Sequence, residues 1–121
     1  MKYVVTRVDA YDPEIEALLI RLQTDCLPGD QPLSPRDGDW WICYSEAGIP
    51  VAFCSIKPSL RWAETGYLSR AGVLPGHRGR GLQKRLIRVR VARARQLGWK
   101  WLYEPTYPYG LKTSVYWRRK I

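Results

Sequence analysis

Three glycines within six residues, placed between a strand pattern and a helix pattern, constrain this chain more than any other feature. Residues 73–84 read VLPGHRGRGLQK, and the glycines are Gly76, Gly79 and Gly81. Pro75 and Gly76 end the strand pattern, and apolar residues at helical spacing follow. Glycine lets the backbone approach a ligand closely, and the first amides of a helix lack internal partners. The segment therefore predicts an anion-binding turn, most naturally for a pyrophosphate.

The patterns on either side of this turn predict a mixed α/β fold. A strand, a helix and a second strand are expected at 64–74, 79–97 and 99–103, and such a crossover joins parallel, adjacent strands. Residues 111–121 are expected to form a short helix, which gives the order β-α-β-β-β-α-β-α. The other expected elements are strands at 2–8, 40–44 and 51–57, the last two forming a hairpin, and a helix at 12–26.

Length and composition predict a single globular domain over residues 1–121. The hydrophobic fraction is 45%, with six Trp and eight Tyr, so intrinsic disorder is excluded. No apolar run is long enough to span a membrane, and the N-terminus has no signal-peptide pattern, so we expect a cytoplasmic protein without membrane contact. The three cysteines lack CxxC spacing and there is one His, which predicts buried free thiols and no metal site.

The charge is strongly and unevenly positive. Twenty Lys and Arg stand against eleven Asp and Glu, a net charge of +9. Residues 78–95 contain no acidic side chain and eight basic ones, and so predict a polyanionic partner: nucleic acid, an acidic protein or a phosphate-rich cofactor. The eight are Arg78, Arg80, Lys84, Arg85, Arg88, Arg90, Arg93 and Arg95.

Two common phosphate-binding motifs do not fit the turn. Gly76 and Gly81 have the spacing of a P-loop, but Leu82 and Gln83 follow where Lys and Ser or Thr are required. The pair Gly79 and Gly81 begins a Rossmann fingerprint, but Lys84 occupies the position of its third glycine.

The turn instead resembles the acetyl-CoA signature V-x-P-x-x-(R/Q)-x-x-G-x-(G/A) of the GNAT acyltransferases (Gcn5-related N-acetyltransferases). Val73-x-Pro75 and residues 78–83 match it, except that Gln83 stands where Gly or Ala is usual. The order of elements is also similar, so the resemblance covers nearly the whole chain. It implies a mixed, mostly antiparallel central sheet flanked by helices.

The resemblance also implies acetyl-CoA as cofactor. Backbone amides of residues 79–84 would hold the pyrophosphate, and residues 71–73 would pair with the pantetheine arm like an added strand. One amide of that strand would polarise the thioester carbonyl. The cofactor-binding residues implied in this way are Ala71, Gly72, Val73, Arg78, Gly79, Arg80, Gly81, Leu82, Gln83 and Lys84.

The implied reaction is direct attack of an amine on acetyl-CoA. Only about one lysine-type amine in 10³ is neutral at pH 7, so a general base helps. Glu64 and Glu104, expected near strand ends, are the candidates for that base. Tyr116 is the candidate acid for the departing thiolate, in competition with Tyr107 and Tyr109. Trp62 and the loop at 28–39 are expected to be walls of the acceptor site.

Members of the family usually continue past their last helix into a closing β-hairpin, whereas this sequence stops at Ile121. We therefore expect a shortened member, a fragment, or a chain that borrows a strand from a partner, for example in a homodimer. The amine acceptor stays open between small molecules and proteins. The alternative function is a CoA-binding or cofactor-free docking or inhibitor protein that uses the basic face of helix 79–97 against a protein or nucleic acid.

Overall fold

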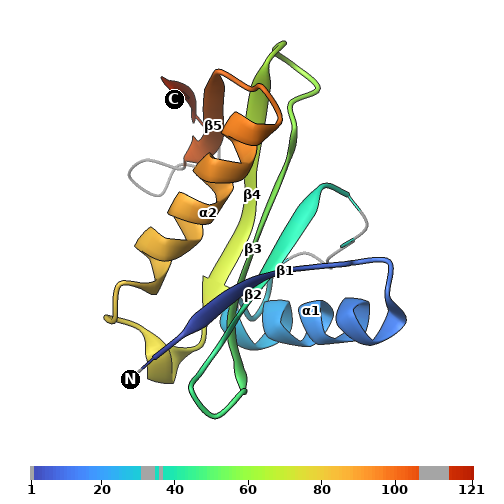
Figure 1. The fold of residues 1–121 in the computed structure, drawn as a ribbon, viewed down its shortest axis with the longest axis vertical. Helices are drawn as coiled ribbons and strands as arrows, with labels where there is room; N and C mark the ends of the chain where they lie inside the picture. Colours follow the sequence, from blue (N-terminus) through green and yellow to red (C-terminus); the bar gives the residue numbers. More distant parts are fainter. Residues whose placement is uncertain (1, 31–34, 36, 107–114) are drawn as a thin grey trace.

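The computed structural model describes residues 2–30, 35, 37–106 and 115–121, and shows one six-stranded sheet with a helix on each face (Figure 1). The strand order is β1-β2-β3-β4-β5-β6, and only the β4–β5 pair is parallel. The elements are β1 (Val4–Val8), α1 (Pro13–Cys26), β2 (Asp39–Tyr44), β3 (Pro50–Pro58), β4 (Thr65–Val73), the short 3-10 helix η1 (Pro75–His77), α2 (Leu82–Gln96), β5 (Trp101–Thr106) and β6 (Val115–Lys120).

The predicted crossover is confirmed. Strands β4 and β5 are parallel neighbours joined through α2, and β2 and β3 form the predicted antiparallel hairpin. The mixed, mostly antiparallel sheet flanked by helices is therefore the observed architecture. Neither α1 nor α2 is long and apolar enough to cross a membrane.

The core has two halves, one on each face of the sheet. Trp40, Ile42 and Phe53 pack with α1, whereas Trp41 and Cys54 pack with α2. Consecutive residues of a strand point to opposite faces, so a strand covered on both faces is apolar throughout. All three cysteines are buried and free, as predicted.

Element boundaries near the turn differ from the predicted ones. Helix α2 begins at Leu82 rather than at 79, because Gly79 and Gly81 have φ of +77° and +76°, in the left-handed region. Strand β5 begins at Trp101 rather than at 99, because the Trp99 amide donates to the Ala94 carbonyl and closes the end of α2.

The predicted helix over 111–121 is wrong for residues 115–120, and residues 111–114 lie outside the described residues. Residues 115–120 form β6, which pairs antiparallel with β5 from Trp101↔Lys120 to Thr106↔Val115. Strand β5 would otherwise present an unpaired edge, and the sequence Val-Tyr-Trp at 115–117 has high β-propensity. Strand β6 thus covers the outer edge of β5.

Candidate functional site

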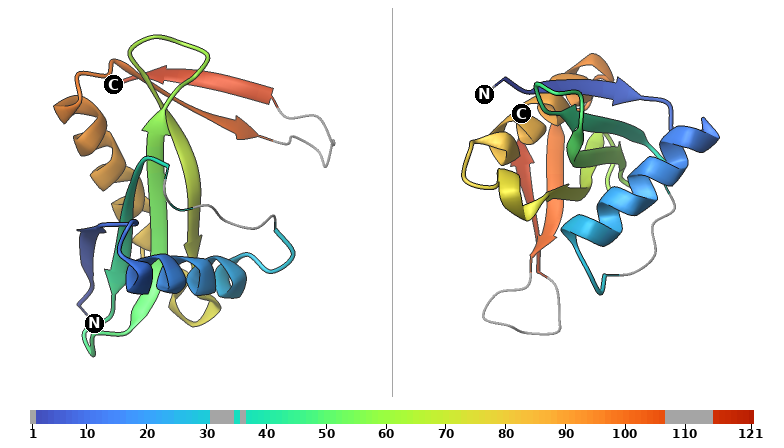
Figure 2. Two further views of the ribbon diagram at one scale, coloured as in Figure 1. Left: turned by 90° about the vertical axis from the view of Figure 1, so that its right-hand side faces the viewer. Right: turned by 90° about the horizontal axis from the view of Figure 1, so that it is seen from below.

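Strand β4 is paired with β5 over only part of its length. The registered pairs are Thr65↔Trp101, Gly66↔Leu102 and Tyr67↔Tyr103, and none follows among the described residues. Beyond this point β5 and β6 turn away from β4, as the left view of Figure 2 shows. Residues 68–73 therefore have an open backbone edge in the middle of the sheet, where an extended ligand can add main-chain hydrogen bonds.

A β-bulge in β4 lies beside this opening. Ser69 and Arg70 together oppose the single residue Ser55 of β3, so the register shifts by one. Bulges bend a strand and increase its twist, which accounts for the divergence of β4 from β5. The Arg70 amide donates to the Ser55 side-chain oxygen at 3.1 Å, and the Arg90 guanidinium donates to the Ser55 carbonyl at 3.4 Å.

The hydrogen bonds of β4 show which of its groups face the opening. The amide of Leu74 donates to Val51 of β3, and that of Arg70 donates to Ser55 of β3. Hydrogen-bonding groups alternate in direction along a strand, so those of Ala71 and Val73 face the other edge. This places the Ala71 and Val73 amides on the side from which the resemblance implies that pantetheine pairs.

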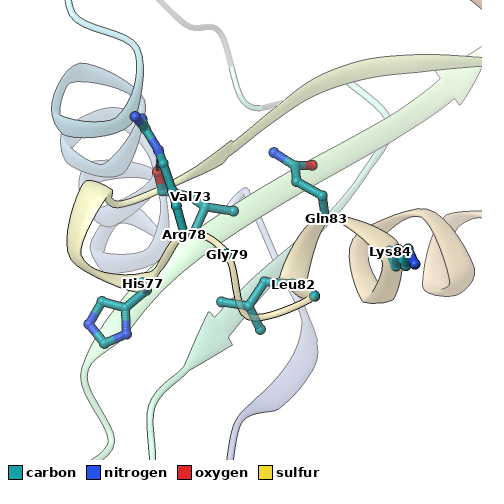
Figure 3. Close-up of a pocket in the computed structure, with 8 residues that line it drawn as sticks. Val73, His77, Arg78, Gly79, Leu82, Gln83 and Lys84 are labelled. Carbon is teal, nitrogen blue, oxygen red and sulfur yellow. Dashed lines mark hydrogen bonds between the residues drawn. The ribbon is translucent and has the colours of Figure 1, made fainter.

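The glycine-rich turn lies where β4 ends. Its cavity of about 400 Å³ is shown in Figure 3 and is lined by Val73, His77, Arg78, Gly79, Gly81, Leu82, Gln83 and Lys84. Gly81 caps α2 with a left-handed backbone and no side-chain hydrogen bond. The first amides of α2 are therefore left without a side-chain cap beside the cavity, at the positive end of the helix dipole. Seven of the ten predicted cofactor residues come together here.

Arg78 connects the turn to β4 and α1 through two hydrogen bonds. Its Nε donates to the Val73 carbonyl at 3.0 Å, and a terminal nitrogen donates to the Cys26 carbonyl at the end of α1 at 3.2 Å. The side chains of Arg78 and His77 leave the turn in opposite directions (Figure 3), and the His77 Nδ1 is 2.9 Å from the Tyr3 hydroxyl. Arg78 therefore fixes the turn to α1 and β4 instead of pointing at the cavity as a free cation.

The two predicted bases lie in different surroundings. Glu64 precedes β4, with φ of +52°, and its carboxylate forms an ion pair with Lys100 at 3.0 Å. The nine residues of β4 separate it from the turn by roughly 30 Å. Glu104 lies on β5, one residue past the last β4–β5 pair, and its charge acts on buried Arg90. Only Glu104 is therefore beside the opening.

The Tyr116 backbone lies in β6, where its Cα pairs with that of Pro105 in β5. Its predicted role stays a prediction, and Tyr107 and Tyr109 lie outside the described residues. Within the described ranges no group of three or more His, Cys, Asp or Glu could hold a metal ion.

A second cavity, of about 580 Å³, was not predicted from the sequence. It lies along β4 on the α1 face and is lined by Leu27, Asp30, Lys57, Tyr67, Ser69, Arg70 and Ala71. Trp62, a predicted wall of the acceptor site, packs edge-on against Tyr103, with 4.8 Å between the ring centroids. The ring centroids of Tyr103 and Tyr67 are 4.9 Å apart. These residues are distant in sequence, so only the pairing of β3, β4 and β5 brings them together.

An open strand edge, a bulge and an uncapped helix after a glycine turn together form the candidate site of this α/β protein. The model of the acetyltransferase (GNAT) family matches residues 8–107, and the chain belongs to that family. Its class is therefore that of an acyltransferase. No protein with a curated description matches the chain by sequence.

Solved structures with this fold include N-acetyltransferases. The IAA acetyltransferase of Bacillus cereus has a TM-score of 0.69 at 17% identity, over 88% of this chain and 67% of that one. A candidate acyl-CoA N-acyltransferase of Klebsiella pneumoniae has a TM-score of 0.61 at 28% identity, over 88% and 73%. N-acetylglutamate synthase of Neisseria gonorrhoeae, solved with coenzyme A, has a TM-score of 0.65 at 19% identity, over 91% and 26%.

Proposed function

We propose that this chain transfers an acetyl group from acetyl-CoA to an amine. The observation that supports this most is the open edge of β4, which leads directly into the uncapped N-terminus of α2. The pyrophosphate would accept hydrogen bonds from the amides of the turn, and the arm would pair with Ala71 and Val73. The cytoplasm, which is the expected location of the protein, would supply the acetyl-CoA and keep the three cysteines reduced.

In the proposed reaction the amine nitrogen attacks the thioester carbonyl directly. A C–N bond forms, the C–S bond breaks, and the amine loses a proton while the thiolate gains one. An amide on the open edge of β4 would stabilise the oxyanion, a role typically worth about 3 kcal/mol. Glu104 is the better-placed base, and Tyr116 is the proposed acid for the thiolate.

The test is calorimetric titration of the full chain with acetyl-CoA and with CoA at fixed salt. Wild type should bind with micromolar affinity, and Gly81→Glu should abolish binding because a carboxylate then occupies the anion site. Gly98→Glu is the matched control, since Gly98 has the same left-handed backbone, with φ of +79°, at the other end of α2. Absence of binding to the wild type, or equal losses in both variants, would refute the cofactor assignment.

Glu104→Gln separates catalysis from binding. Loss of the base should lower kcat by 10²-fold or more, about what general-base catalysis contributes, with acetyl-CoA affinity unchanged. Glu64→Gln is the control, because that exposed carboxylate pairs with Lys100 away from the opening. Equal rates in wild type and Glu104→Gln would remove Glu104 from the mechanism.

A second function is favoured by the outer surface of α2. Lys84, Arg88 and Arg95 are exposed and lie on one side of the helix. This face suits docking to an acidic protein or a nucleic acid. Docking of this kind should tolerate Gly81→Glu, and binding to a labelled oligonucleotide should weaken steeply with salt.

A further inference from the structure

We propose that the amine acceptor also carries an anionic group, a carboxylate or a phosphate, which binds Lys57 and Arg70 in the cavity on the α1 face. This inference rests on the proposed acetyl transfer and concerns the substrate class. Lys57 lies on β3 and Arg70 in the bulge of β4, and neither belongs to the family signature in the turn.

The cavity has the correct position for an acceptor. Ala71 packs against the core on the α2 face, yet it also lines the cavity on the α1 face. Val73, two residues further along the same edge, lines the cavity of the turn. The two cavities therefore lie next to each other along the open edge of β4, where Ala71 lines one and Val73 the other. A thioester held along this edge would border the cavity on the α1 face.

The charge of the cavity favours an anion. Its described lining has two cations, Lys57 and Arg70, and one carboxylate, Asp30. The Lys57 ammonium lies 5.6 Å from the centre of the Tyr67 ring and makes no ion pair with a described residue. One positive charge is thus left over for a ligand, and a half-buried ammonium gains more from an anion than an exposed one does.

The aromatic residues beside the cavity fit the other end of such a substrate. Tyr67, Tyr103 and Trp62 form a continuous contact next to Lys57, at the point where β4 and β5 part. Their rings offer an apolar wall to the carbon chain between the anion and the amine. An acceptor anchored at Lys57 and Arg70 can then direct its amine along β4 toward Ala71.

The test compares matched amines as acceptors for acetyl-CoA, with the acetylated product measured by mass spectrometry. The set contains ω-amino acids of two to six carbons, the corresponding aminoalkylphosphonates, and their neutral amides. Rates are corrected for the fraction of free amine. We expect kcat/KM to be about ten-fold higher or more for the anionic compounds, which corresponds to about 1.4 kcal/mol. The class with the higher kcat/KM, the amino acids or the aminoalkylphosphonates, shows whether the acceptor carries a carboxylate or a phosphate.

Variants of Lys57 attribute the preference to this cavity. Lys57→Met should raise KM for the anionic amines about ten-fold and leave kcat and the neutral amides nearly unchanged. Lys57→Glu should reverse the preference. Arg95→Glu is the control with the same charge change on exposed α2. Should Lys57→Glu not fold, Lys57→Met, which keeps the carbon chain, decides the question.

The outcomes separate this inference from the function on which it rests. Acetyl-CoA binding that is lost in Gly81→Glu, together with equal rates for anionic and neutral amines, overturns the inference alone. A preference unchanged by Lys57→Glu also overturns it. If no amine is acetylated, titration of the CoA-loaded chain with the same anions decides, and absence of binding overturns the inference. Absence of acetyl-CoA binding itself overturns the proposed function.

Discussion

Glycine is required in the turn and in the adjoining strand β4 for two different physical reasons, backbone conformation and space. Gly79 and Gly81 have open space where a Cβ would lie, so their left-handed φ is what requires glycine. Gly72 has an ordinary backbone, but a Cβ there would meet the Cys26 Cβ at 2.7 Å and the Phe53 ring at 2.9 Å. At position 72 glycine is therefore required because β4 packs closely against α1.

Gly72→Ala should destabilise the fold by about 1–3 kcal/mol, the usual cost of overpacking a core. The contacting atoms belong to a buried helix residue and a buried ring, so they cannot move away cheaply. Urea unfolding of the two proteins measures the difference. Gly76→Ala, where a Cβ would meet no atom within 4 Å, should change the free energy of unfolding by less than about 0.5 kcal/mol.

Arg78→Met should loosen the turn. Removing the guanidinium leaves the Val73 and Cys26 carbonyls without their donor, which should cost about 1–2 kcal/mol of stability. Acetyl-CoA affinity should fall with it, because the turn loses its connection to α1. Arg88→Met, at an exposed position of α2, should leave both quantities unchanged. An Arg78→Met protein with normal affinity would show that the brace does not position the turn.

The roles of single glycine and proline residues were the features most easily predicted from the sequence, because these residues act on the local backbone. The pattern of Pro75, Gly79 and Gly81 was sufficient to locate the turn. The brace from Arg78 to Cys26 spans 52 positions, and no spacing rule connects them. The same is true of Lys57, Tyr67 and Arg70, which only strand pairing brings to one cavity.

At the scale of elements, the bulge of β4 depends on α2. Two residues of β4 face one residue of β3, so the ladder is interrupted at Ser55. Arg90, only 4% exposed, donates to the Ser55 carbonyl and to Leu86 of its own helix. Burial lowers the pKa of Arg90, while the charge of Glu104 opposes that shift. Helix α2 thus supplies a hydrogen bond that the interrupted ladder lacks.

Arg90→Ala should cost about 3 kcal/mol, since it removes both hydrogen bonds and the packing of a buried side chain. The more specific result is local: amide hydrogen exchange at residues 69–72 should accelerate beyond that of the other strands. Arg95→Ala, one turn further and exposed, should change neither. Uniform acceleration across the whole sheet would mean that Arg90 supports only the core.

Element type was predicted correctly up to β5 and incorrectly for residues 115–120. The expected helix there came from the local residue pattern alone, whereas the observed strand depends on the exposed edge of β5. Pairing with β5 is a property of the assembled sheet, and the β-propensity of residues 115–117 agrees with it. The divergence of β4 from β5 is likewise a property of the assembled sheet and was carried only by the resemblance.

At the scale of the whole molecule, ionisation of the core limits stability at high pH. Burial raises the pKa of the Cys54 thiol from 9.0 to about 12, although the charge of Arg90 opposes this. The folded state then holds the proton longer than the unfolded state. Its contribution is complete below pH 9 and is lost as pH rises toward 12, by up to about 1.4 kcal/mol per pH unit.

Cys54→Ala should flatten this dependence. Urea unfolding at pH 8.5 and at pH 10.5 should show a larger loss of stability in wild type than in the variant. Tyr and Lys side chains titrate in both proteins, so the difference between the two slopes isolates the thiol. Equal slopes would mean that the buried thiol does not ionise on unfolding in this range.

Acetyl-CoA should stabilise the whole chain by filling the opening in its sheet. At a hundred times the dissociation constant the gain is about 2.7 kcal/mol. Hydrogen exchange should slow both in the turn and at residues 71 and 73 of β4. ADP, which has the pyrophosphate without the arm, should slow exchange in the turn only. Equal protection of β4 by ADP would contradict pairing of the arm with that strand.

The opening in β4 is made by the main chain. A bulge and a strand that turns aside create it, and two glycines shape the turn at its end. Side chains that do not take part in these backbone features can therefore differ without closing it. A solved structure that shares only 17% of its residues with this chain has the same fold. An opening made by the backbone does not depend on any one of the side chains around it.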